Sequence, residues 1–154
     1  QATYAPLFAH VEGWQWRPDL IWFDNLRSVR SVNWYVQMLY GTNKGTNMLS
    51  LTENGAPVEG NDGLYASAVY DKATKGYIVK IANTSDVAKD VKLTFNGVKA
   101  LKDGKVITLH VDNMQATNTL DRPENVVPQT ADVKAQGNVL SVSVPAKTFA
   151  VYRF

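Results

Sequence analysis

The groups best suited to chemistry lie in one segment near the start of the chain, residues 10–25 (HVEGWQWRPDLIWFDN). It holds three of the four tryptophans, interleaved with Glu, Arg, Asp and Asn, and the 120 residues after Trp34 hold no tryptophan. Carboxyl groups can act in pairs as acid and base, so Glu12, Asp19 and Asp24 are the candidates for that role. Because they share one loop, the alternative is that they only hydrogen bond and pair charges within it.

Other site chemistries find little support. His10 and His110 are isolated, so no pair stands at metal-ligand spacing, and we expect no metal and no cofactor. Cysteine is absent, which excludes disulfides and thiolate ligands. The sequence has no nucleophile elbow, phosphate loop or dinucleotide fingerprint. Asn83-Thr84-Ser85 matches the glycosylation pattern, but so short a pattern occurs often by chance.

The composition is that of a globular chain and favours neither a nucleic-acid nor a membrane partner. Of 154 residues, 45% are hydrophobic and 19% charged, which are values typical of a folded domain. The net charge is +2 and its sixteen cations are scattered, so we expect no nucleic-acid partner. No apolar run approaches the ~20 residues that cross a bilayer, so we expect no membrane partner.

The first part of the chain has the pattern of one β/α unit. Residues 4–11 (YAPLFAHV) form a nearly continuous apolar run, typical of a strand buried on both faces. After the Trp-rich loop, Ser31 can cap a helix over residues 32–40, with Gly41 ending it. The helix places four apolar side chains on one face: Val32, Val36, Leu39 and Tyr40. Strand, long loop and helix are the elements of a β/α unit.

The period changes to two after residue 60. Six segments alternate as strands and are separated by Gly, Asn and Pro turns: 64–70, 77–83, 87–95, 106–112, 139–144 and 148–154. This spacing predicts an antiparallel β-sandwich or jelly roll. The long loop 114–132 should be functional or packed against another part. We therefore expect two units, an incomplete β/α unit over residues 1–45 and a β-sandwich over 46–154.

These residues resemble a known family. The stretch YAPLFAHVEGWQWRPDLIWFDNLRS and the helix end VQMLYGTNKGTNML closely resemble the C-terminal region of family 51 glycoside hydrolases, the α-L-arabinofuranosidases. DRPENVVP at 121–128 and the final PAKTFAVYRF are similar to the sandwich of the same family. The resemblance implies a (β/α)8 barrel whose eighth strand is 4–11 and whose last helix is 32–40, followed by the sandwich.

The resemblance also gives the Trp-rich loop a role. Loops after barrel strands line the active sites of this fold, where indoles stack on sugar rings and polar groups bind hydroxyls. It implies a substrate-binding set of Trp14, Trp16, Arg17, Trp22 and Asn25. Each has a structural alternative: the rings could seal the barrel rim or pack below it, Arg17 could hold a carboxylate, and Asn25 could cap a turn. Trp34 is expected in the core between helix and sandwich.

The family places both catalytic glutamates on earlier barrel strands, so we expect no catalytic residue here and no activity of this chain alone. In the parent enzyme the partner would be an arabinose-containing plant polysaccharide or oligosaccharide. A free-standing carbohydrate-binding module is the alternative, and a purely structural or assembly domain is a third interpretation. The abrupt start at Gln1 suggests a fragment or processed product, with a periplasmic or secreted location favoured. The orphan strand should promote dimerisation, swapping or repacking.

Overall fold

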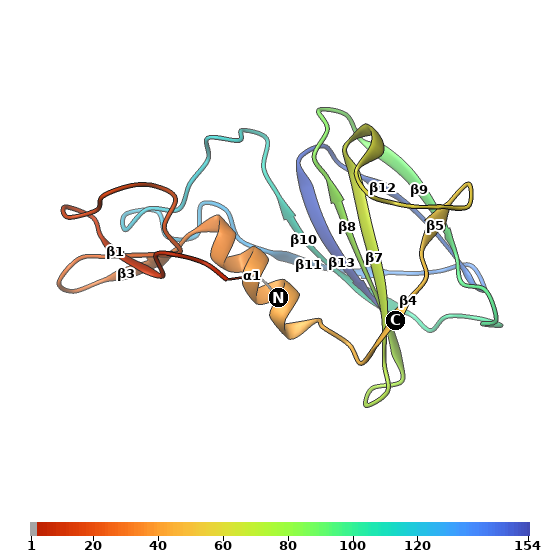
Figure 1. Cartoon of the computed structure of the whole chain (residues 1–154). Coiled ribbons are helices and arrows are strands. Elements are labelled where there is room, and N and C mark those ends of the chain that lie inside the picture. The colour runs from red at the N-terminus through yellow and green to blue at the C-terminus, as the bar shows by residue number, and fades with distance from the viewer. Residues whose placement is uncertain (1–2) are drawn as a thin grey trace.

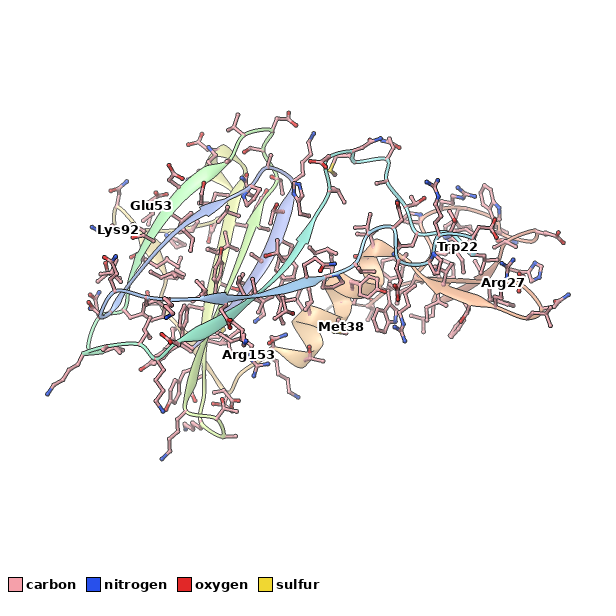
Figure 2. All side chains as sticks on the ribbon, turned by 180° about the vertical axis from the view of Figure 1, so that it is seen from behind. Trp22, Arg27, Met38, Glu53, Lys92 and Arg153 are labelled. Atoms are coloured by element: carbon pink, nitrogen blue, oxygen red, sulfur yellow. The ribbon has the colours of Figure 1, made fainter. Side chains whose placement is uncertain are left out.

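The computed structural model describes residues 3–154, which form a small sheet at one end, a helix, and a β-sandwich at the other end (Figure 1). Figure 2 shows the same arrangement from behind: Trp22 and Arg27 lie at the end opposite Glu53 and Lys92, and Met38 lies on the helix between them. The sandwich and the preceding β/α remnant agree with the fold class expected from the sequence.

The small sheet contains three strands, β1 (Phe8–His10), β2 (Ile21–Phe23) and β3 (Ser28–Arg30), in that order. β1 and β2 are parallel, whereas β2 and β3 are antiparallel. The loop expected between strand and helix therefore contains two strands of its own. The strand predicted over residues 4–11 is observed only over Phe8–His10. Its pairing extends further back, because the amides of Leu20 and Ile21 donate to the carbonyls of Pro6 and Leu7.

One edge of this sheet has no neighbour. Within the described residues β1 pairs only with β2, so its other edge offers free N–H and C=O groups. The side chains beside it are also uncovered, since Leu7 is 53% and Phe8 61% exposed. The apolar run that indicated burial on both faces is thus buried on one side only.

Helix α1 (Val32–Thr42) joins the two ends of the molecule. Ser31 caps it as predicted, its side-chain oxygen accepting a hydrogen bond from the Trp34 amide. The helix continues through Gly41 to Thr42, two residues beyond the predicted end, and Asn43 is the C-cap. Lys80 donates from Nζ to the Asn43 carbonyl at 2.5 Å, and burial lowers the pKa of this lysine.

The sandwich pairs a six-stranded antiparallel sheet with a two-stranded one. In spatial order the large sheet contains β11 (Gln129–Val133), β10 (Gly104–His110), β13 (Thr148–Arg153), β8 (Gly76–Asn83), β7 (Leu64–Asp71) and β4 (Asn47–Leu49). The small one pairs β12 (Val139–Val144) with β9 (Lys89–Thr94). A hairpin, β5 (Thr52–Glu53) and β6 (Ala56–Pro57), and a 3-10 turn (Asn61–Gly63) precede β7. All six strands predicted for the sandwich are confirmed, whereas β4, β5, β6 and β11 were not predicted.

The large sheet is buried on both faces. One face packs on the two-stranded sheet and forms the inner core, which contains Val79, Ile81, Leu140, Val144, Ala150 and Tyr152. The other face packs on α1 and the β10–β11 connection and forms the outer core, which contains Leu39, Ile78, Leu109, Val126, Phe149 and Val151. The predicted apolar face of the helix is confirmed, since Val32 and Val36 pack here and Tyr40 stacks on Phe149 at 5.0 Å.

The long connection from β10 to β11 reaches back to the small sheet (Figure 1). Asn118, which is buried, donates to the carbonyls of Arg30 and Val126 and accepts from the Val126 amide. The prediction that this loop packs against another part is therefore confirmed. The one helix among the described residues is not long and apolar enough to cross a membrane.

Asn83, at the end of β8, is bound to the end of β12 and to the loop after β8. It is 1% exposed, and its amide nitrogen donates to the carbonyls of Val87, Val144 and Pro145. Its oxygen accepts from the amide and hydroxyl of Ser85. The side chain is therefore buried and fully hydrogen bonded in the fold.

The Asn83→Ala variant tests this role. The substitution leaves three carbonyls and the amide and hydroxyl of Ser85 without their hydrogen-bond partner. We therefore expect a loss of about 2–3 kcal/mol of unfolding free energy, measured by urea titration. Ser141→Ala, on the exposed face of β12, is the control and should stay within about 0.5 kcal/mol of the parent chain. Equal stabilities of both variants would contradict the assignment.

Candidate functional site

The Trp-rich segment is held together by a cation between two indoles. Trp14 and Trp22 meet edge to face with ring centroids 6.2 Å apart. The Arg17 guanidinium carbon lies 4.6 Å from the Trp14 centroid and 5.1 Å from that of Trp22. The negative faces of the rings attract the cation. Among the described residues the contacts of Arg17 are aromatic, and none of the salt bridges supports the alternative that it holds a carboxylate.

The carboxylate-binding role belongs to Arg27. Its guanidinium pairs with Asp24 at 3.0 Å and with Asp121 of the long connection at 3.1 Å. Asp24 also accepts from the backbone amides of Leu26 and Arg27, which is the turn-capping role considered for Asn25. These amides, and then the Arg27 side chain, hold the pKa of Asp24 below its usual value.

Trp34 was expected in the core between helix and sandwich, and this expectation is wrong. It belongs to neither core cluster and packs edge to face on Tyr35, with the Arg30 guanidinium 4.5 Å from its centroid. His10 is hydrogen bonded within the same loop, since its Nδ1 accepts from the Glu12 amide. No group of three His, Asp or Glu side chains that could hold a metal occurs in residues 3–154.

Two concavities flank the Trp-rich segment. A groove of about 670 Å³ lies between the small sheet, the start of α1 and the long connection, and Arg17, Trp22, Arg27, Asn33 and Asn118 are among the residues that line it. An aromatic pocket of about 330 Å³ lies on the other side, lined by residues that include Phe8, His10, Trp14, Trp16 and Phe23. Asp19 lines both.

The structure brings most of the predicted binding residues together. Trp14, Arg17 and Trp22 form one contact, and Trp16, which is 54% exposed, joins Trp14 on the wall of the aromatic pocket. Asn25 lies apart, exposed in the turn between β2 and β3 and lining neither concavity. Their contact with substrate stays a prediction.

Sequence reasoning missed the special position of Asp19. It is 1% exposed, and neither carboxylate oxygen has a hydrogen-bond partner in the described residues. It was grouped with Glu12 and Asp24 as a loop carboxylate. The available signal was its place between Pro18 and the apolar run Leu20-Ile21-Trp22-Phe23, since an acid followed by so apolar a stretch is a candidate for burial.

Comparison with known proteins identifies the family. The model described as "Alpha-L-arabinofuranosidase C-terminal domain" matches residues 1–148. The chain belongs to this family. Its match to the arabinofuranosidase C-terminal domain covers both the Trp-rich segment and nearly all of the sandwich, so the two ends of the molecule belong to one family unit.

Curated relatives carry the corresponding names. The probable alpha-L-arabinofuranosidase A of Aspergillus flavus is 30% identical over 97% of this chain. Alpha-L-arabinofuranosidase 1 of Arabidopsis thaliana is 26% identical over 98% of it. In both cases the chain spans 23% of the relative, about a quarter of its length.

Solved structures agree with the arabinofuranosidase fold. An arabinose-bound MgGH51 α-L-arabinofuranosidase superposes with a TM-score of 0.85 at 27% identity, covering 98% of this chain and 23% of that one. The Thermotoga maritima α-L-arabinofuranosidase in its arabinose complex superposes with a TM-score of 0.74 at 15% identity, covering 88% and 31%. At that identity the second likeness shows a shared fold alone.

The cation–aromatic contact of this arabinofuranosidase domain can be checked by NMR. In Arg17→Gln, we expect the indole N–H signals of Trp14 and Trp22 to shift while that of Trp34 stays in place, because Arg17 contacts only the first two rings. Arg30→Gln is the matched control and should move the Trp34 signal instead. A uniform response of all indoles to either change would contradict these contacts.

The Asp24 turn predicts a pH dependence. Because the folded pKa of Asp24 lies below its ordinary value of 3.8, its stabilisation is complete above that value and is lost as pH falls through the folded pKa. Carboxyl ¹³C shifts should therefore show Asp24 titrating below 3.8. Asp24→Asn should remove this part of the acid sensitivity of unfolding. Titration at or above the ordinary value would count against the turn.

Proposed function

We propose that this chain is the C-terminal part of a retaining α-L-arabinofuranosidase that removes terminal arabinofuranosyl residues from arabinose-containing polysaccharides or oligosaccharides. The observation that carries the proposal is the family match over residues 1–148, which spans both the Trp-rich segment and the sandwich. The relatives bear that enzyme name, and this chain is only about a quarter of their length, 23%. The activity would thus belong to a longer protein.

The carboxylates of the Trp-rich segment support inactivity of the chain by itself. A retaining glycosidase needs two carboxyl groups about 5–5.5 Å apart, one as nucleophile and one as acid/base. Asp24 is occupied by Arg27 and by two backbone amides, and Asp19 is shielded from solvent. Glu12 is exposed on the loop. If Asp19 and Asp24 do not act as acid or nucleophile, Glu12 has no second carboxylate in this segment to pair with. We therefore expect both catalytic glutamates elsewhere in the longer protein.

The division near residue 45 is part of the proposal. The small sheet would complete a barrel, whereas residues 46–154 would form the accompanying sandwich. The free edge of β1 and the exposed Leu7 and Phe8 support this, because a neighbouring parallel strand would pair that edge and cover those side chains. In the isolated chain the same edge is available for self-association.

The Trp-rich segment would border the arabinofuranosyl site. Trp14, Trp16 and Trp22 offer ring faces for the apolar C–H side of a sugar, and Arg17 orders two of those rings. The sandwich would support this end through α1 and the Arg27–Asp121 pair. Because a polysaccharide does not enter cells, the proposal favours a periplasmic or secreted location.

Hydrolysis of 4-nitrophenyl α-L-arabinofuranoside tests the proposal. The longer protein that contains this chain should release nitrophenol, with arabinose first appearing in the anomeric form of the substrate by NMR, and residues 1–154 should release none. Activity of the 154-residue chain alone would overturn the expected inactivity. A longer protein inactive on every arabinofuranoside, combined with binding of arabinoxylan by residues 46–154 alone, would favour the carbohydrate-binding module.

A further inference from the structure

The Asp19 carboxylate lacks what a buried charge requires. Asp19 is 1% exposed, and both Oδ1 and Oδ2 are without a hydrogen-bond donor among the described residues. None of the described salt bridges includes it, since Arg27 pairs with Asp24 and Asp121 and Arg17 lies over the indoles. Burying a carboxylate without a partner is costly, so a donor from outside these residues would be strongly favoured there.

The aromatic pocket is the side from which that donor would come. The groove on the other side of Asp19 already contains Arg17, Arg27 and Asp121, whose charges have partners within the chain. The aromatic pocket is lined by no Lys, no Arg and no second carboxylate, only by apolar and aromatic groups together with His10 and Gln15. Asp19 is its single anion, and Trp14, Trp16 and Phe23 are among its aromatic lining residues.

We propose that Asp19 binds a furanoside unit in the aromatic pocket, its two oxygens accepting hydrogen bonds from two sugar hydroxyls while the indoles of Trp14 and Trp16 cover the C–H face. This rests on the proposed function and names the anchoring group of that site. A sugar fits because it combines several neutral donors with apolar faces. The volume of about 330 Å³ is at the lower end of ligand sites and suits a single sugar unit.

Entry of the sugar requires a small rearrangement. The carboxylate oxygens are shielded from solvent, whereas Trp16 is 54% and Trp14 43% exposed. These two indoles are among the exposed walls of the pocket, so we expect them to move when the sugar enters. Binding should therefore change the surroundings of Trp14 and Trp16 and leave Trp34, at the start of α1, unaffected.

Titration of the 154-residue chain with methyl α-L-arabinofuranoside, followed by the indole N–H signals, tests the proposal. The Trp14 and Trp16 signals should shift and saturate, and Asp19→Asn should weaken binding at least about tenfold, since hydrogen bonds to a charged group are lost. Glu12→Gln removes an exposed carboxylate of the same loop and should leave binding unchanged. Absence of saturable binding to the parent chain, or equal binding by Asp19→Asn, would overturn the proposal.

Two further readouts separate the alternatives. Without ligand, Asp19→Asn should unfold at the same or a higher temperature, because the amide carries no uncompensated charge; a lower midpoint or failure to fold would reveal a structural partner and overturn the proposal. Arginine amide is the second probe, and Asp19-dependent binding of it in place of the furanoside would assign Asp19 to a protein cation instead.

The enzyme assay keeps this inference distinct from the proposed function. If the longer protein hydrolyses arabinofuranosides and its Asp19→Asn variant keeps an unchanged KM and kcat, only the Asp19 assignment fails. If the longer protein has no such activity, the proposed function fails, while furanoside binding by this chain is still decided by the titration. A raised KM of the Asp19→Asn variant, with its folding unchanged, supports both the Asp19 assignment and the proposed function.

Discussion

Burial of the large sheet on both faces is the constraint on which the rest of the structure depends. β8 and β13 send alternate side chains to opposite sides: Val79, Ile81, Ala150 and Tyr152 to the inner core, and Ile78, Phe149 and Val151 to the outer core. The inner side is covered by the two-stranded sheet. The outer side would expose a large apolar surface without α1 and the β10–β11 connection, so both are fixed on it by the hydrophobic effect.

Fixing α1 in this way also fixes the small sheet. The helix follows β3 directly, with Ser31 as its N-cap, and the long connection that covers the outer core includes Asn118 and Asp121. These two residues bind the Arg30 carbonyl and the Arg27 side chain, so the Trp-rich segment is tied to the sandwich by both a covalent and a non-covalent route. A sandwich far from the aromatic residues therefore controls where they lie.

Two groups near the Trp-rich segment have no partner among the described residues. Arg17 and Arg27 find partners within the chain, whereas Asp19 is buried without one and β1 has an unpaired edge. Both features point to groups beyond these residues, a strand for the edge and hydrogen-bond donors for the carboxylate. A chain that spans 23% of the length of its relatives can lack the strand that would pair this edge. The donors that we propose for Asp19 are the hydroxyls of a sugar.

The sequence by itself determined the elements whose signals are local. Alternation of apolar residues predicted six strands, the Ser31 cap predicted the start of α1, and the quoted stretches predicted the family. Short strands such as β2, β3 and β4 carry too few residues for a period to appear, and β11 is mostly exposed.

Only the tertiary structure decided which charges meet. Arg27 and Asp121 are 94 residues apart in sequence. Arg17 contacts aromatic rings because folding places Trp14 and Trp22 beside it. The burial of Asp19 was likewise decided by the elements around it. Pairing and desolvation depend on distances in space, which spacing along one chain does not contain.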